Sequence, residues 1–146
     1  MNKYQRLTML LVVFGITGCE QASKGFSLPV GDPVKGEQVF LTLECLSCHQ
    51  MDGYERPENA NEELAVKLGG KVDSLKTYAE LVTSVINPSH QLAEGYDLSK
   101  IQVDGQSMMP SFNDVLSVTD LVNLITFLES HYELEPYSKT EYMIYR

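Results

Sequence analysis

The chain has 146 residues, which is long enough for one small domain and too short for two. It carries 20 acidic and 11 basic residues, a formal net charge of −9, and this balance argues against nucleic acid as a partner. The sequence shows no internal repeats and no low-complexity tracts.

Residues 1–18 resemble the signal peptide of a bacterial lipoprotein. Two basic residues, Lys3 and Arg6, precede an apolar run that is too short to span a bilayer. The run ends at residues 16–19, Ile-Thr-Gly-Cys, which resemble a lipobox. We therefore expect cleavage before Cys19 and acylation of its thiol, which would anchor the chain to a membrane. The alternative is an ordinary secretory signal that happens to lie beside a cysteine.

A tether and one helix are expected to precede the next cysteine. Residues 19–31 contain Ser, Gly and Pro with little apolar content, which is typical of a flexible linker. The predicted domain covers residues 32–134. Its first helix is expected over residues 34–44, because Asp32 can cap it and Pro33 suits its first turn.

Residues 45–49 read Cys-Leu-Ser-Cys-His, the C-x-x-C-H pattern of a c-type haem attachment site. Cys45 and Cys48 can each add to a vinyl group of haem, which fixes the porphyrin through two thioethers. His49 is then held against the iron as its first axial ligand. No second run of this kind exists, so we expect one covalent haem c.

A C-x-x-C pair has two other common uses in proteins. A thioredoxin-like redox motif needs a βαβ context, which the sequence does not indicate. A structural zinc site needs four ligands. Beyond the pair, the chain offers only Cys19, His90 and His131.

The rest of the domain is predicted to alternate helices with long loops. A short helix is expected over residues 61–67. A capping-box spacing at Thr77 and Glu80 predicts a helix that ends before Pro88. Ser117 and Asp120, followed by a helical apolar period, predict a last helix to about residue 131. No convincing strands are found, and the long loops are acceptable because haem itself would fill the core.

The second iron ligand is expected from residues 107–112, Ser-Met-Met-Pro-Ser-Phe. Met109 is the preferred candidate, because it lies far from His49 in the sequence and shortly before the last helix. A Met/His ligand pair raises the reduction potential of haem. Met108 and His90 remain alternatives, and His90 would give a bis-histidine haem of lower potential.

These features together resemble a monohaem class I c-type cytochrome. The resemblance rests on Gly36 and Phe40 before the haem motif, on Met109-Pro110, and on Phe127-Leu128 in the last helix, and it covers residues 32–132. It implies an all-α fold of three to five short helices with long loops around one haem. It also implies that the first and last helices cross, with Gly36 and Phe40 against Phe127. Phe40 lies five residues before Cys45, where four is commoner.

The expected function is single-electron transfer, without enzymatic activity or a small-molecule substrate. The carrier would be tethered to a membrane of the bacterial envelope, facing the periplasm, with the choice of outer or inner membrane open. Its acidic surface suits redox partners with basic docking surfaces. The alternatives are a cytochrome subunit of a larger oxidoreductase or oxidase, and a haem peroxidase or gas sensor. The Tyr-rich tail, residues 135–146, could pack on the domain or dock onto a partner.

Overall fold

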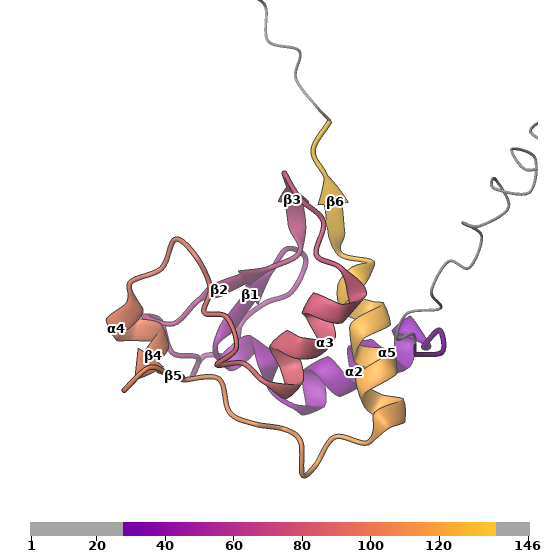
Figure 1. Ribbon diagram of the computed structural model, residues 1–146, viewed down its shortest axis with the longest axis horizontal. Coiled ribbons are helices and arrows are strands. Elements are labelled where there is room, and N and C mark those ends of the chain that lie inside the picture. Colours follow the sequence, from indigo (N-terminus) through magenta and orange to yellow (C-terminus); the bar gives the residue numbers. More distant parts are fainter. Residues whose placement is uncertain (1–27, 137–146) are drawn as a thin grey trace, which may run out of the picture.

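The computed structural model describes residues 28–136. Within them the chain forms four α-helices, one 3₁₀ turn and six short strands (Figure 1). The predicted signal peptide, Cys19 and the tyrosines of the tail (Tyr137, Tyr142 and Tyr145) lie outside the described residues. None of the helices in the described part has the length and apolar character needed to cross a bilayer.

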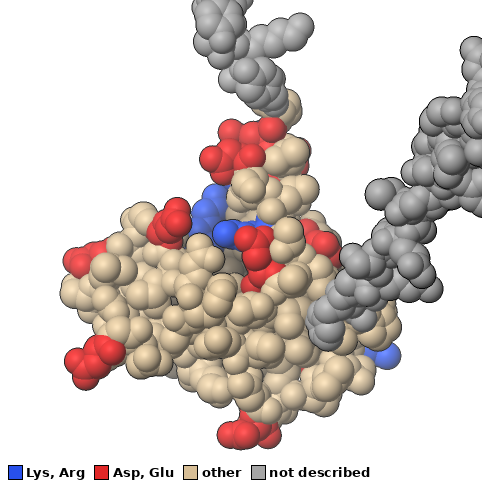
Figure 2. All heavy atoms as spheres, in the orientation of Figure 1, with Lys and Arg blue, Asp and Glu red and all other residues tan. Residues whose placement is uncertain are grey.

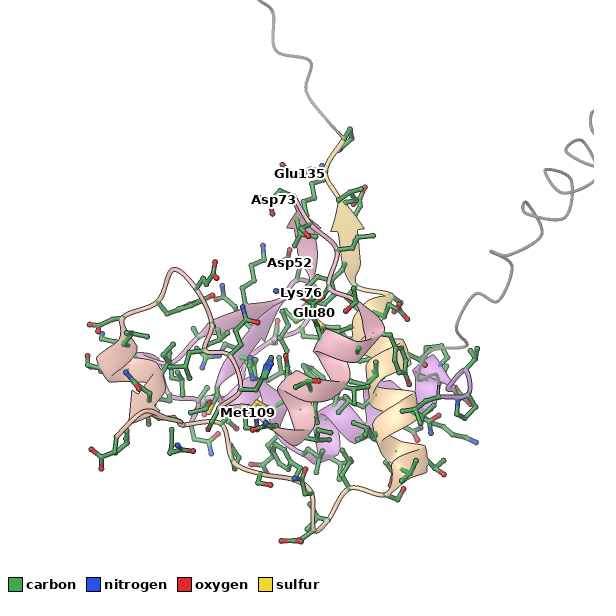
Figure 3. All side chains as sticks on the ribbon, viewed as in Figure 1. Asp52, Asp73, Lys76, Glu80, Met109 and Glu135 are labelled. Atoms are coloured by element: carbon green, nitrogen blue, oxygen red, sulfur yellow. The ribbon has the colours of Figure 1, made fainter. Side chains whose placement is uncertain are left out.

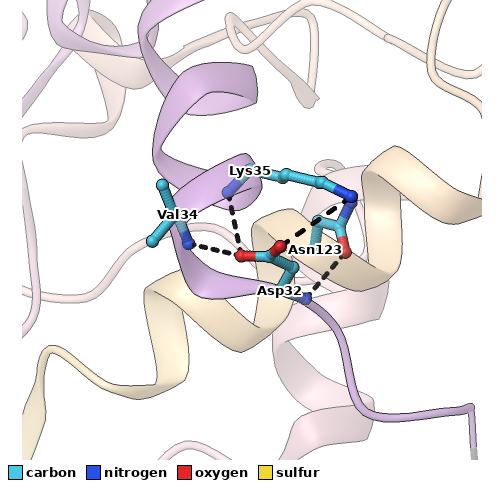
Figure 4. A network of polar contacts seen from close by, with 4 residues as sticks. All are labelled: Asp32, Val34, Lys35 and Asn123. Atoms are coloured by element: carbon cyan, nitrogen blue, oxygen red, sulfur yellow. Dashed lines mark hydrogen bonds and ion pairs between the residues drawn. The ribbon is translucent and has the colours of Figure 1, made fainter.

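Helix α2 (Pro33–Thr42) begins at the capping residue that the sequence predicted. The Asp32 carboxylate accepts hydrogen bonds from the backbone N–H groups of Val34 (3.0 Å) and Lys35 (3.3 Å). The Asp32 N–H itself donates to Oδ1 of Asn123 on the last helix, at 2.8 Å (Figure 4). The start of the first helix is thus tied directly to the last helix.

Helix α5 (Val118–Glu129) packs across α2, as the sequence predicted. A Cβ atom at Gly36 would lie within 2.6 Å of the Phe127 Cβ and would collide with the Asn123 carbonyl, so only glycine allows this approach. The Phe40 and Phe127 rings lie beside the crossing with their centroids 5.3 Å apart. The predicted contact is therefore confirmed, despite the unusual spacing between Phe40 and Cys45.

Helix α3 (Tyr78–Ile86) has the predicted capping box. The Thr77 hydroxyl accepts from the Glu80 N–H (3.2 Å), and the Glu80 carboxylate accepts from the Thr77 N–H (2.7 Å). Ser117 caps α5 by accepting from the Asp120 N–H at 3.1 Å. Figure 1 shows α3 and α5 side by side, with α2 behind them.

The prediction that the chain lacks strands was wrong. Three two-stranded sheets occur in the described residues, each built from very short strands. The pairs are β1 (His49–Met51) with β2 (Val66–Leu68) in parallel, β3 (Gly70–Val72) with β6 (Tyr132–Leu134) in parallel, and β4 (Gln102–Val103) with β5 (Gln106–Ser107) in antiparallel order. Strands of two or three residues are too short to show an alternating pattern in the sequence.

The predicted helix over residues 61–67 was wrong as well. The Asn61 side chain accepts from the Glu63 N–H (3.0 Å), which makes a turn instead of a helical start. The Val66 N–H donates to the Cys48 carbonyl (3.0 Å), so this backbone bonds the haem-motif segment. Conversely, a short helix that was not predicted, α4 (Leu98–Ile101), follows its capping residue Asp97.

The chain contacts the fold before the predicted start of the domain. Leu28 packs against the core, and the Gly31 N–H donates to the Thr126 hydroxyl at 3.0 Å. The other end is held similarly, because the Glu135 N–H donates to the Val72 carbonyl at 2.8 Å. Both ends of the described chain are thus fixed by hydrogen bonds to its interior elements.

Candidate functional site

One large cavity collects the residues that the sequence singled out. Its lining includes Cys45, Cys48 and His49 together with Met108 and Met109. The cavity opens to solvent and has a volume of about 240 Å³. The remaining walls are mostly apolar and come from α3, α4, α5 and the loops, for example Leu64, Leu81, Val85, Ile101, Phe112 and Leu128.

The two cysteines are brought together by a tight turn. A 3₁₀ turn, η1 (Cys45–Ser47), follows Glu44, whose backbone is left-handed at φ 53°. The turn is closed by the Cys48 N–H, which donates to the Cys45 carbonyl (3.3 Å), and both thiols are free. Burial, with a smaller effect of Cys48, raises the pKa of Cys45 to about 11. The Cys45 sulfur is therefore a neutral thiol at neutral pH and adds no buried charge to the cavity.

The imidazole of His49 is held by strand β2. Its Nδ1 lies 3.1 Å from the Val66 carbonyl oxygen, which can only accept, so Nδ1 carries the proton. The lone pair is then on Nε2, the atom left to bind a metal. Burial is the main cause that lowers the pKa of His49, and the nearby Arg56 charge lowers it further. A neutral imidazole with its other nitrogen held by a carbonyl is the arrangement of a histidine ligand.

Arg56 is a residue near this site that sequence reasoning missed. Its Nε donates to the Leu46 carbonyl (3.1 Å), and its Nη2, with two N–H groups, lies within hydrogen-bond distance of three more carbonyls, those of Ser47 (3.1 Å), Asn61 (2.8 Å) and Leu64 (2.9 Å). Its rarity could have drawn attention to it, because the only other arginines of the chain are Arg6 and Arg146, near the two ends. Arginine suits such a place, since its planar group presents five donors in a fixed geometry.

Met108 and Met109, which directly follow β5, both line the cavity. Met109 is half-buried, whereas Met108 is more exposed at 42%. The Met109 N–H donates to the Ser107 hydroxyl (3.2 Å), and the Ser107 N–H donates to the Ser89 hydroxyl (3.0 Å). Figure 3 shows Met109 in the middle of the molecule, between α4 and α3.

The two remaining histidines lie elsewhere. His90 is exposed and is not among the described residues that line the cavity. His131 follows α5, where its Nδ1 lies 2.8 Å from the Phe127 carbonyl and its ring packs 4.4 Å from the Phe127 ring. It thus interacts with the last turn of the helix.

Haem fits the residues that the cavity presents. Two thiols, an imidazole with a free Nε2 and a thioether line one mostly apolar space. Lys67 and Lys76 are exposed and also line it, and they would supply cations for the anionic propionates of a bound haem. Lys67 also pairs with Asp52, at 3.5 Å. Figure 2 shows basic side chains beside a recess near the base of β3.

A comparison with known protein families agrees with this fit. The family model for cytochrome c matches residues 33–131, from the first residue of α2 to just beyond α5. No curated protein and no solved structure matches the chain. The family carries covalent haem c, and the Cys45–Cys48 pair fits its C-x-x-C-H motif. The predicted helical class and haem cofactor are thereby confirmed, with the short strands as an addition. The chain belongs to the cytochrome c family and has a class I cytochrome c-like fold, which serves haem-based electron transfer.

Proposed function

We propose that this cytochrome is a lipid-tethered electron carrier of the bacterial envelope, facing the periplasm, with His49 and Met109 as its axial ligands. The observation that carries the proposal is the shared cavity of Cys45, Cys48, His49 and Met109. When bound there, haem supplies an iron that gains or loses one electron without bond changes in a substrate. The chain provides the two ligands and an apolar wall that keeps water away.

A ligand on each face of the iron explains why an electron carrier is favoured over an enzyme. A six-coordinate iron has no open position for peroxide or a gas. Met109 is held toward the cavity by the Ser89–Ser107 hydrogen bonds described above, while His49 is fixed by the Val66 carbonyl. Rapid binding of CO to the reduced protein would contradict this arrangement and favour the sensor alternative.

The Met109 proposal is tested by Met109→Ala in the full-length holoprotein. We expect loss of the weak absorption band of Met–Fe(III) coordination and a lower reduction potential, because a thioether favours the reduced iron. Met108→Ala is the matched control and should keep both properties, as should His90→Ala. If Met109→Ala changes neither the band nor the potential, Met109 is not the ligand.

The tether part of the proposal rests on the lipobox-like residues before Cys19. Nine peptide steps join Cys19 to Leu28, the first described residue, so the domain would stay within about 30 Å of the anchor. Such confinement raises the effective concentration of the carrier at membrane redox complexes. Cys19→Ser should move the protein from the membrane fraction to the soluble periplasmic fraction. Continued membrane association of that variant would contradict lipid anchoring.

Redox partners with basic docking surfaces complete the proposal. The net charge is −9, and Figure 2 shows acidic side chains spread around the margin of the visible face, with uncharged residues across its middle. A complementary positive partner would be steered toward such a surface, and the encounter would slow as salt rises. Native purification from membranes distinguishes a free carrier from a subunit, because a subunit would retain a stoichiometric partner.

A further inference from the structure

Arg56 joins two segments that shape the histidine side of the cavity. Two of its four carbonyl acceptors, Leu46 and Ser47, lie between the two cysteines. The other two, Asn61 and Leu64, lie in the loop that leads into β2. The guanidinium therefore connects the haem motif to the strand that supplies the carbonyl partner of His49.

The same connection is repeated by the backbone around Arg56. The Asn61 N–H donates to the Ser47 carbonyl (3.0 Å), and the Val66 N–H donates to the Cys48 carbonyl (3.0 Å). Val66 in turn accepts the Nδ1 proton of His49. A change at Arg56 would therefore reach the imidazole through one short chain of hydrogen bonds.

The charge of Arg56 is not neutralised by an ion pair within the described part of the chain. Ion pairs there join Lys35 to Asp32, Lys67 to Asp52 and Lys100 to Glu63, all on exposed side chains. Arg56, by contrast, is half-buried and bonds only neutral carbonyls in its four contacts. Its field is screened less than that of a surface cation.

A cation at this place acts on the two iron states differently. Oxidation adds one positive charge to the iron, and a nearby fixed positive charge raises the free energy of the oxidised form more than that of the reduced form. Hydrogen bonding and charge around a ligand are recognised means by which a protein sets a haem potential. The effect on the potential depends on the charge of Arg56, whereas the link between the haem motif and the loop before β2 depends on its hydrogen bonds to backbone carbonyls.

We propose that Arg56 is a positioning residue, which holds the His49 segment against β2 and whose charge favours the reduced iron. This role rests on the proposed function, since it requires haem iron at His49. It does not depend on whether Met109 or Met108 is the second ligand.

The test compares three full-length holoproteins with the wild type. Arg56→Gln removes the charge and most donors, Arg56→Lys keeps the charge but lacks the planar fork, and Lys35→Gln removes an exposed cation outside the cavity. Redox titration gives the potential, and hydrogen exchange reports the Asn61 and Val66 amides. These readouts separate an effect on the iron from simple loss of stability.

We expect the equilibrium constant for reduction to fall about tenfold in Arg56→Gln, equivalent to about 59 mV for one electron. It should fall about threefold in Arg56→Lys and stay unchanged in Lys35→Gln. Both Arg56 variants should exchange the two amides at least about tenfold faster. A potential in Arg56→Gln equal to that of Lys35→Gln would overturn the proposal.

Arg56→Lys decides the matter if Arg56→Gln yields no holoprotein. In that variant, faster exchange of the two amides with an equilibrium constant for reduction within about threefold of the wild type supports the role, because the charge is kept and the directed hydrogen bonds are lost. Unchanged exchange, or a fall of about tenfold despite the retained charge, overturns it. A wild-type protein without covalent haem would overturn the proposed function itself. A wild-type carrier whose potential does not respond to Arg56 would overturn only the role of Arg56.

Discussion

The two regions that hold the proposed iron ligands, His49 and Met109, differ sharply in how they are packed. The region of α2, the haem motif, α3 and α5 contains almost all of the core. Residues 88–115, which we call the distal segment, contribute only Ile101 to the thirteen buried hydrophobic side chains of the described chain. The distal segment has a few polar links to the rest, such as the Lys67 N–H to the Tyr96 hydroxyl (2.8 Å) and the Asn113 side chain to the Ile86 carbonyl (2.9 Å).

This difference indicates which ligand is lost first. A segment with few buried apolar contacts opens locally at a lower free energy than the core does. His49 belongs to the firmly packed region, whereas Met109 belongs to the distal segment. Binding of Met109 to iron would therefore be a main restraint on the distal segment, and its loss should leave the crossing of α2 and α5 intact.

The largest expected effect comes from breaking the firmly packed region at Gly36. Gly36→Ala places a methyl group against the Asn123 carbonyl and the Phe127 side chain, so the two helices must separate. We expect the free energy of unfolding to fall by about 3 kcal/mol, as for overpacking of a core. Urea unfolding followed by circular dichroism measures the change.

Gln38→Ala is the control for Gly36→Ala, because Gln38 is an exposed residue of the same helix. Its substitution should change the free energy of unfolding by less than about 0.5 kcal/mol. Equal stability of the two variants would mean that the helices do not meet at Gly36. It would contradict the claim that the region of α2 and α5 is the more firmly packed of the two.

The same contrast governs what the sequence could predict. Helices α2, α3 and α5 were predicted because their signals are local: Asp32 before Pro33, Thr77 with Glu80, and Ser117 before a helical apolar period. The haem motif was predicted because its chemistry is contained in five consecutive residues. A local pattern of this kind needs no knowledge of the tertiary structure.

The contacts around His49 could not be predicted in this way. The partner of its Nδ1 is the Val66 carbonyl, which lies 17 positions away, and the strands that align them have only three residues each. Arg56 binds carbonyls, which every residue has, so the sequence does not specify its partners. The buried Asn123 was missed for a related reason, since its acceptor role depends on how two distant helices meet.

Asn123 and Asn113 provide a matched pair for a second prediction. Each uses its side chain for one hydrogen bond to backbone, Asn123 in the buried crossing and Asn113 at the exposed edge of the distal segment. Asn123→Ala should lower the free energy of unfolding by about 1–2 kcal/mol, because the Asp32 N–H loses its acceptor. Asn113→Ala should lower it by less than about 0.5 kcal/mol.

The same two variants should have the opposite order in their effect on the Met109–iron bond, with Asn113→Ala weakening it more than Asn123→Ala does. In urea, the Met–Fe(III) absorption band should disappear at a lower concentration in Asn113→Ala than in the wild type, because the distal segment loses a link to α3. In Asn123→Ala the band should shift only as far as the circular dichroism does. Coincident loss of band and helix in all three proteins would show that the two regions unfold as one.

The smallest expected effect concerns the start of α3, the helix whose last residue anchors the distal segment. Hydrogen bonds from Thr77 lower the pKa of the Glu80 carboxyl below its ordinary value of 4.5. Because the folded state favours the ionised form, this contribution to stability is complete above pH 4.5 and is lost as pH falls through the lower folded-state pKa. Glu80→Gln should therefore weaken the loss of stability on acidification below pH 4.5.

The control for Glu80→Gln is Glu58→Gln, because Glu58 is exposed and lies outside any helix. Both variants are compared with the wild type by urea unfolding at pH 7 and below pH 4.5. Because the capping box lies at the opposite end of α3 from Asn113, Glu80→Gln should shift the circular dichroism and the Met–Fe(III) band together. A shift of the band alone would mean that the distal segment responds to the whole of α3, and the boundary between the two regions would then lie before Thr77 instead of after Ile86.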